Sequence, residues 1–188
     1  MKKILSILLI SVILFSCSDS EIKYHIDETT SPSDTLTYLK SDMTLLNGNV
    51  FCEFGENGKY INGKKDGIHK EWYEDGQIES EENLKLGGRN FDNYYLKKWW
   101  ENGQLHVNHN KKGYINYFDN GHIMKEGKLK NWKEIGIHKS YYSNGSLMIE
   151  INKENDSMII FDKSGKSLYN GGYDFYVYNT FFYDQMFE

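Results

Sequence analysis

Glutamates that could do acid–base chemistry cluster in one short stretch of the chain. Glu79 and Glu81 lie two residues apart, so on a strand they would share a face, and Glu82 follows directly. Paired carboxylates can act as a general acid and a general base. Here they lie on the outgoing strand of a predicted hairpin, beside Lys70. We favour the interpretation of a solvated charge row that protects a strand edge, and we expect no catalytic residues.

The histidines and cysteines show no pattern that is typical of a metal site or a nucleophile. His106 and His109 are three residues apart, so they would face opposite sides of a strand, whereas a metal needs several converging ligands. Cys52 lies within a strand-like run, residues 50–54, where we expect a buried thiol. The sequence holds no Ser-His-Asp, HExxH, CxxC or phosphate-loop pattern, and it predicts neither a metal site nor a cofactor site.

The element that would carry these side chains is a β-hairpin over residues 67–81. Segments of mixed polar and apolar residues flank Asp75 and Gly76, and Asp-Gly is the strongest short-range signal for a two-residue type I′ turn. Such a turn also determines the strand register. The register has three cross-strand pairs: Tyr73 with Ile78, Trp72 with Glu79, and Lys70 with Glu81.

The same unit recurs at intervals of about 20 residues, which is the signature of a repeat array. Four units are clear, a weaker one covers residues 54–60, and a decayed one covers residues 161–165. The structural turn glycines of these units are Gly58, Gly76, Gly103, Gly121 and Gly145. The Gly-Ile-His-Lys of residues 67–70 returns at residues 136–139, so its histidine is interpreted as a strand feature rather than a ligand.

Each unit has an aromatic pair, a polar residue, Asn-Gly or Asp-Gly, and then an aliphatic residue two positions on. This pattern resembles the MORN-repeat variant, which occurs in bacterial proteins often described as antitoxin-like. The resemblance covers residues 46–170. It departs at Tyr94, which replaces the glycine before one aromatic pair, and at residues 86–96, which look like an insertion. It implies stacked hairpins and a binding role, and it implies no catalytic residues.

The array predicts an all-β protein, an elongated antiparallel series of repeated hairpins over residues 46–170. One face would bury the second aromatic of each pair with its aliphatic partner. The other face would carry a candidate binding stripe that is made of the first aromatics: Trp72, Trp99, Tyr117 and Tyr141. Two interpretations stay open for this stripe, a recognition surface or packing against a terminal segment.

The N-terminal residues predict export and a lipid anchor. Residues 1–16 combine two lysines with an apolar run that is typical of a signal peptide and too short for a membrane-spanning helix. Residues 14–17, Leu-Phe-Ser-Cys, resemble a lipobox, so we expect lipid attachment at Cys17. The chain would then be exported and anchored to a membrane of the bacterial cell envelope, facing the periplasm or the surface.

Two further segments flank the array. Residues 17–45 would form a lipidated polar tether and an N-terminal cap, with a linker at residues 27–34. The apolar spacing of residues 35–46 suits either a short helix or a capping strand. Residues 171–188 would form an aromatic C-terminal capping segment. Alternation in residues 173–178 predicts one more strand, which we expect to pack against the array rather than remain exposed.

Charge excludes one class of partner. The chain has 22 basic and 27 acidic residues, and removal of the two lysines of the predicted leader leaves 20 against 27, a net charge of −7. An acidic chain argues against nucleic-acid binding and against electrostatic attachment to anionic lipids. The lipid on Cys17, not charge, would hold the protein at the membrane.

Three hypotheses about function follow. The first is a non-enzymatic, membrane-anchored protein-interaction module with an unknown protein partner, and a basic toxin domain would suit its acidic array by charge steering. The alternative is a binder of an envelope glycan or polymer, with sugar rings stacked on the aromatic stripe. The third, an enzyme, ranks last because no constellation of residues supports one.

Overall fold

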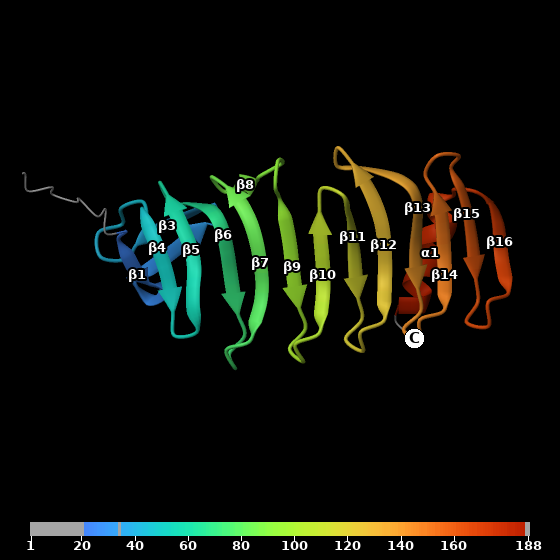
Figure 1. The fold of residues 1–188 in the computed structure, drawn as a ribbon, viewed down its shortest axis with the longest axis horizontal. Helices are drawn as coiled ribbons and strands as arrows, with labels where there is room; N and C mark the ends of the chain where they lie inside the picture. The colour runs from blue at the N-terminus through green and yellow to red at the C-terminus, as the bar shows by residue number, and fades with distance from the viewer. Residues whose placement is uncertain (1–20, 34, 187–188) are drawn as a thin grey trace, which may run out of the picture.

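The computed structural model describes residues 21–33 and 35–186, and it is almost entirely β (Figure 1). The predicted signal peptide and Cys17 lie outside the described residues. A 14-stranded sheet runs the length of the molecule, with successive strands antiparallel except for the parallel pair β1–β4. The predicted fold class, an elongated antiparallel array of hairpins, is therefore confirmed.

The strands of the long sheet, in the order in which they pair, are β1 (Lys23–His25), β4 (Gly48–Cys52), β5 (Gly55–Ile61), β6 (Lys64–Trp72), β7 (Ile78–Lys85), β9 (Tyr95–Trp99), β10 (Leu105–Asn110), β11 (Gly113–Tyr117), β12 (Ile123–Lys130), β13 (Lys133–Tyr141), β14 (Leu147–Asn152), β15 (Ser157–Phe161) and β16 (Ser167–Gly172), while β8 (Gly88–Arg89) pairs with β7. The remaining elements are η1 (Ile26–Glu28), the two-stranded sheet of β2 (Thr29–Ser33) and β3 (Leu36–Leu39), and the helix α1 (Phe175–Met186).

The predicted type I′ turn at Asp75 and Gly76 is wrong. The amide of Gly76 donates to the Tyr73 carbonyl at 3.0 Å, and the amide of Tyr73 donates to the Gln77 carbonyl at 2.8 Å. Gly76 has a φ of +85°, whereas Asp75 keeps a negative φ and accepts the Gln77 amide on its side chain at 2.9 Å. This is a three-residue loop, a type I turn closed by a left-handed glycine.

The extra loop residue changes the register that we predicted. Trp72 pairs with Ile78, so the expected pairs of Tyr73 with Ile78 and of Trp72 with Glu79 are wrong. A bulge between Glu71 and Trp72 then restores the register, and the pair of Lys70 with Glu81 is confirmed. Gly103, Gly121 and Gly145 have the same place and the same sign of φ, at +78°, +83° and +85°.

Two-residue loops with positive φ at both positions do occur, but at the opposite edge of the sheet. They are Asn62-Gly63 between β5 and β6, Leu86-Gly87 between β7 and β8, and Asn131-Trp132 between β12 and β13. The backbone of these three loops is left-handed at both positions. Other loops at the same edge use an Asn side chain as the first edge does, since Asn110 accepts the Lys112 amide at 2.8 Å and Asn152 accepts the Glu154 amide at 2.9 Å.

Gly58 is not a turn glycine, which corrects the prediction for the weakest repeat unit. It lies inside β5 opposite Val50, and the hairpin turn of that unit lies at residues 53–54 instead. A Cβ on Gly58 would lie 2.7 Å from Nδ1 of His69 and 2.7 Å from the carbonyl oxygen of Ile68. Glycine is needed here because the buried His69 ring occupies that space.

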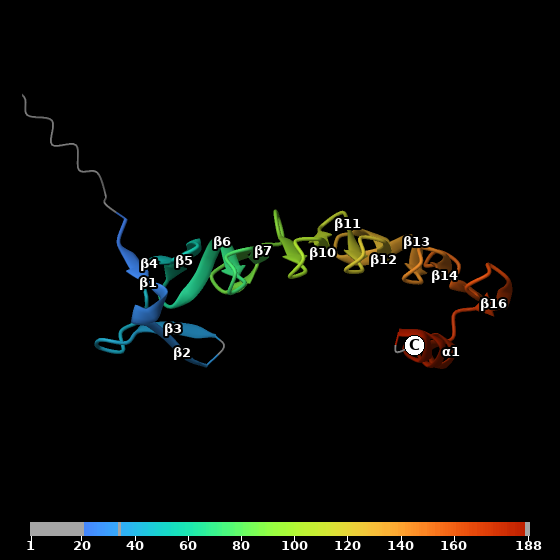
Figure 2. The ribbon, with the colours of Figure 1, turned by 90° about the horizontal axis from the view of Figure 1, so that it is seen from below.

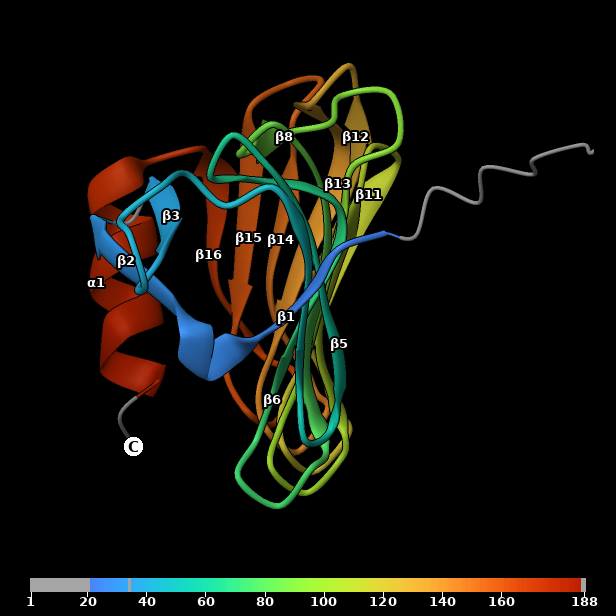
Figure 3. The ribbon, with the colours of Figure 1, turned by 90° about the vertical axis from the view of Figure 1, so that its left-hand side faces the viewer.

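Both terminal segments cover the same side of the sheet. Figures 2 and 3 show β2–β3 at one end and α1 at the other, below the long sheet in Figure 2 and to its left in Figure 3. We call this side the helix face and the other side the open face. No second layer of described residues lies on the open face (Figure 2).

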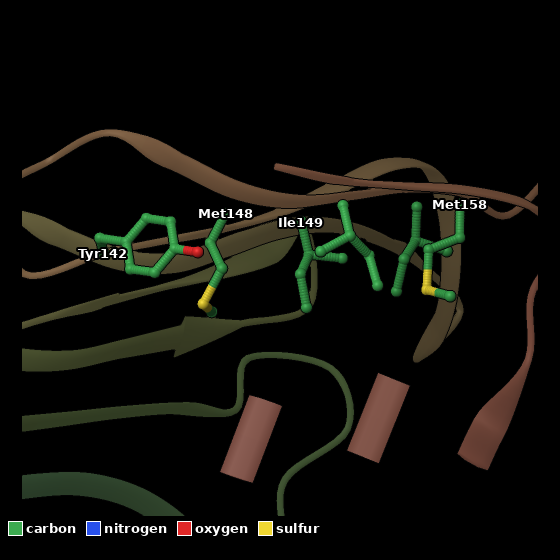
Figure 4. Close-up of a cluster of buried hydrophobic side chains, with 6 residues drawn as sticks. Tyr142, Met148, Ile149 and Met158 are labelled. Atoms are coloured by element: carbon green, nitrogen blue, oxygen red, sulfur yellow. The ribbon is translucent and has the colours of Figure 1, made fainter. Parts of the chain in front are cut away.

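An apolar cluster lies beneath α1 on the helix face (Figure 4). Ile149, Met158 and Ile160 are each at most 1% exposed, and Val177, Tyr178 and Phe181 of the helix pack against their cluster. Burial of such side chains stabilises the fold by roughly 1.5–3 kcal/mol each. The C-terminal segment therefore packs against the array, as we expected.

Its conformation differs from the prediction, because residues 175–186 form a helix rather than a strand. Asp174 accepts the amides of Tyr176 and Val177 at 2.8 and 3.1 Å and so acts as the N-cap. The predicted linker at residues 27–34 is also wrong, since η1 and β2 occupy its described part. Of the two forms left open for residues 35–46, the structure has a strand, β3.

Candidate functional site

The candidate site is built on one row of side chains that crosses the open face. Residues that are paired across strands lie on the same face, so consecutive pairings trace the row from β6 to β14. We call it the charge row: Lys70, Glu81, Lys97, Asn108, Ile115, Glu126, Lys139 and Glu150. All eight side chains are partly exposed. Glu150 precedes and follows residues that pack beneath α1, which places the row on the opposite face from the helix.

Side chains within the row and beside it hold its carboxylates in place. Lys70 and Glu81 lie 3.7 Å apart, and Lys139 and Glu150 lie 3.6 Å apart. The Tyr95 hydroxyl donates to Glu81 at 2.9 Å, and the Tyr141 hydroxyl donates to Glu126 at 2.7 Å. Burial, and after it the bonded carboxylate, raises the pKa of Tyr95 to about 12. This phenol therefore stays protonated and remains a donor at neutral pH.

A shallow hollow of about 460 Å³ lies at the centre of the open face, over β10 to β13. Asn108, Ile115, Glu126 and Lys139 of the charge row line it, together with Ile137, which is 47% exposed. The backbone of Gly113 and Gly127 forms part of its lining. The open face thus has a depression near its centre that is lined by two isoleucines and by charged and amide side chains.

The predicted stripe lies on this same face. Trp72, Trp99, Tyr117 and Tyr141 each stand two residues beyond a member of the charge row, on every second strand of the sheet. All four are half-buried. Trp72 packs over Gly55, where a Cβ would lie 2.9 Å from the indole, and its buried Nε1 has no hydrogen-bond partner among the described residues. The described terminal elements β2–β3 and α1 lie on the helix face (Figures 2 and 3), while Ile26 of η1 lines a shallow hollow together with Trp72.

The second aromatics have a role that sequence reasoning missed, because they link one unit to the next. The Tyr73 hydroxyl donates to the Trp99 carbonyl at 2.6 Å, Nε1 of Trp100 donates to the Tyr117 carbonyl at 3.2 Å, and the Tyr142 hydroxyl donates to the Phe161 carbonyl at 2.8 Å. Phe118, at the same place, has no donor, and Asn120 links to the Ser143 carbonyl at 2.8 Å instead. These bonds orient the stripe by holding the backbone that carries it.

The two repeated histidines lie on the helix face, against glycines of the preceding strand. His69 is 4% exposed over Gly58, and His138 is 5% exposed over Gly127. Burial lowers the pKa of His69 to about 4, and its Nε2 lies 2.7 Å from the Lys59 carbonyl oxygen. Nδ1 of His138 lies 2.8 Å from the Tyr114 hydroxyl. A signal was present in the sequence, since each histidine follows its glycine by eleven residues.

The glutamates considered for acid–base chemistry do not form one site. Glu81 belongs to the charge row on the open face, whereas Glu82 pairs with His69 and accepts the Tyr94 hydroxyl at 2.7 Å. Cys52 is a half-buried free thiol. No group of three or more His, Cys, Asp or Glu side chains that could hold a metal occurs among the described residues.

Two segments, residues 65–85 and residues 134–154, match a known repeat family. They coincide with the hairpins β6–β7 and β13–β14, which carry the two Lys–Glu pairs of the charge row. These hairpins are similar to the MORN repeat variant. Such repeats suggest an interaction or binding module and are generally non-enzymatic.

No curated protein matches the chain. In the described part of the chain, no helix is both long and apolar enough to cross a membrane. The two MORN-like hairpins are separated by β8 to β12, and this intervening part supplies both the uncharged centre of the charge row and most of the hollow. The candidate binding surface therefore extends over more strands than the two matched hairpins.

Proposed function

We propose that this protein is a non-enzymatic interaction module that binds a protein partner through the open face of its MORN-like sheet. The observation that carries the proposal is that no second layer of described residues covers the open face, which presents half-exposed aromatic, charged and apolar side chains in one register. Aromatic side chains are enriched among the residues that dominate binding energy at protein interfaces.

The proposal includes a membrane anchor and an immunity-like role. The leader-like residues 1–16 and the lipobox-like Cys17 support export and lipid attachment. The acidic chain favours a basic partner, and a toxin domain is one protein of that kind. The resemblance to antitoxin-like MORN proteins motivates this finer part of the proposal.

Affinity capture from crosslinked native membranes tests the proposal. The bait is the full-length lipidated chain, compared with the double variant Trp99→Ala/Tyr117→Ala on the open face. The matched control is Tyr176→Ala, because Tyr176 is an aromatic on α1 that is 82% exposed on the other side of the sheet. We expect the natural chain and the control to capture the same protein in stoichiometric amounts, and the double variant to lose it.

Capture by the natural chain and the double variant alike would refute the open face as the contact surface. Thermal unfolding of each bait shows whether a variant loses capture because it is unfolded. Trp99 and Tyr117 are half-buried, so their removal could destabilise the fold. The double variant is compared with the natural chain only if it still unfolds in one cooperative transition.

The regular stripe favours a second candidate, a glycan or envelope polymer. The four aromatics stand on alternate strands, so they are about 10 Å apart along the sheet. Repeated sugar units could stack on such a row. Quenching of tryptophan fluorescence by purified envelope polysaccharide, lost in the double variant, would support this candidate. Unchanged fluorescence together with a captured protein would exclude it in favour of the first.

A further inference from the structure

The charge row reverses its sign about its own centre. From β6 onward its charges are positive, negative and positive at Lys70, Glu81 and Lys97. Two uncharged residues follow, and the row then continues as negative, positive and negative to Glu150. Turning the row end for end therefore exchanges every sign. A surface with this property is complementary to itself.

We infer that the open face binds the open face of a second copy of this chain, about a two-fold axis that runs along the strands between β10 and β11. This inference rests on the proposed function, because it names the partner for the same face. The axis brings every member of the row opposite its complement in the second copy: Lys70 opposite Glu150, Glu81 opposite Lys139, Lys97 opposite Glu126, and Asn108 opposite Ile115.

Other arrangements of two copies are disfavoured by the same charges. Stacking the two rows in the same direction would put lysine on lysine and glutamate on glutamate. Sliding the two-fold pair by one strand would set Lys70 against Lys139 and Glu81 against Glu126. Like charges that face each other across an interface cost several kcal/mol. The row thus specifies direction and register, and two-fold pairs are the commonest symmetric assemblies of soluble proteins.

The size of the surface suits a specific but reversible pair. Eight strands with a spacing of about 4.8 Å, each contributing five or six residues, span about 600 Å² per copy, or about 1,200 Å² in total. That area lies at the lower end of specific interfaces. Ile115 of both copies would lie near the axis, where apolar contacts would be best shielded from water, and Ile137 on β13 would lie about 12 Å from it.

The charged side chains of the row could form further ion pairs with a second copy. Lys70 and Glu81 are 3.7 Å apart and Lys139 and Glu150 are 3.6 Å apart, so each pair is loose and partly exposed. A second copy would surround each such pair with an opposite one. Lys97 contacts the Tyr95 ring, at 5.6 Å from its centroid, and has no carboxylate within ion-pair distance among the described residues, so Glu126 of the second copy would supply one.

Two single charge reversals test the pair. In one chain Lys97 and Glu126 are three strands apart, about 14 Å, so neither touches the other. In a pair of Lys97→Glu chains, and in a pair of Glu126→Lys chains, like charges would meet twice. When one chain of each kind is mixed, both contacts would again join opposite charges. Full-length chains with two different tags are coexpressed, and capture of one tag is scored for the other.

We expect self-capture to fall at least about tenfold for each variant alone and to return to the natural level when the two variants are mixed. Recovery on mixing also shows that both variants fold. Weakening of natural self-capture by salt would agree with a charged interface. Self-capture that both variants retain, or a loss that mixing does not repair, would overturn the pair. If the same chains still capture a different protein in an open-face-dependent way, the proposed function survives that failure.

Discussion

The two MORN-like hairpins share one face and differ on the other. β6–β7 and β13–β14 have the same loop geometry, the same buried histidine over a glycine, and the same Lys–Glu pair on the open face. On the helix face the first hairpin has Glu71, Ser80 and Glu82 where the second has Ser140, Ile149 and Ile151. The difference therefore concerns what covers each hairpin, not how each hairpin forms.

The contacts on the helix face explain this difference. In the second hairpin the isoleucines lie under α1 and need no polar partners. In the first, Glu71 pairs with Lys65 at 3.2 Å and accepts the Ser80 hydroxyl at 3.1 Å. Alternate residues of a strand face opposite sides, so the residues on the helix face can change while those on the open face stay the same. The same hairpin can therefore carry either an apolar layer or a polar surface on its helix face.

The largest expected loss of stability is in the hairpin β13–β14, whose helix face is apolar. Ile149→Ala should lower the free energy of unfolding by roughly 2–5 kcal/mol, because Ile149 is 1% exposed in the cluster beneath α1. Denaturant unfolding measures the change, and faster hydrogen exchange in α1 should accompany it. Ser80→Ala at the matching position should cost only about 1 kcal/mol, for one lost hydroxyl bond. Equal costs would show that the two hairpins are not packed differently.

The second effect concerns pH. His69 has a pKa of about 4 in the folded state, against 6.5 for an ordinary histidine, because burial disfavours its charged form. The unfolded chain therefore binds a proton first as pH falls, and stability that is fully present above pH 6.5 is lost between about pH 6.5 and pH 4. The loss should amount to roughly 3 kcal/mol.

Unfolding measured from pH 7 to pH 4 checks this expectation. The His69→Gln variant should show a flatter pH dependence than the natural chain across that window. His122→Gln removes an exposed histidine at a turn and serves as the control. A slope that is the same in the natural chain and in the His69 variant would contradict the assignment.

The third effect separates the two glycine–histidine contacts. Gly127→Ala should cost about 1–3 kcal/mol, because the new Cβ would collide with the His138 ring and lie 2.8 Å from the Tyr114 hydroxyl. Gly58→Ala should cost at least as much, because the Cβ would also meet the Ile68 carbonyl and Gly58 has a φ of +137°.

Removing the histidine ring sharpens this contrast. In a His138→Ala background the penalty of Gly127→Ala should largely disappear, since the three nearest atoms belong to the side chains of His138 and Tyr114. In a His69→Ala background the penalty of Gly58→Ala should persist, since backbone causes it. Thermal unfolding of the four single and two double variants gives both coupling energies. Full rescue at Gly58 would show that its backbone is not the constraint.

The smallest expected effect on stability comes from the Lys–Glu pair that both hairpins carry on the open face. Double-mutant cycles on Lys70 with Glu81 and on Lys139 with Glu150 should each give a coupling energy of about 0.2–1 kcal/mol, because both pairs are partly exposed. The measurement is denaturant unfolding at low salt with alanine variants, and the couplings should decrease as salt increases. A coupling well above this range in one pair only would indicate a difference on the open face as well.

Much of the fold could be predicted because its signals are local. Aromatic pairs, Asx-Gly turns and the return of Gly-Ile-His-Lys predicted a series of hairpins, and the pair of Lys70 with Glu81 was predicted correctly because a bulge offsets the extra loop residue. The loop type escaped prediction, because Asp75 and Gly76 fit both a two-residue loop and a longer loop with a bulge. Gly58 shows the same limit, since an Asn-Gly pair inside a strand has the same sequence as a turn.

The candidate site was predicted only in part. The stripe of Trp72, Trp99, Tyr117 and Tyr141 could be assigned to one face from strand alternation alone. The charge row could not be predicted from the sequence, although a Lys and a Glu recur eleven residues apart in both MORN-like hairpins. Its order depends on how each hairpin pairs with the next one, and residues 86–94 intervene between β7 and β9.

The sequence by itself determined the repeat, the strand content, the acidic charge and the hairpin that carries each Lys–Glu pair. These follow from interactions between residues close in the chain. Only the tertiary structure decided that α1 and β2–β3 cover the same face, that His69 and His138 lie over glycines, and that the charge row reverses its sign at Asn108 and Ile115. Each of these depends on contacts between strands of different hairpins, whose register is set by packing across the whole sheet.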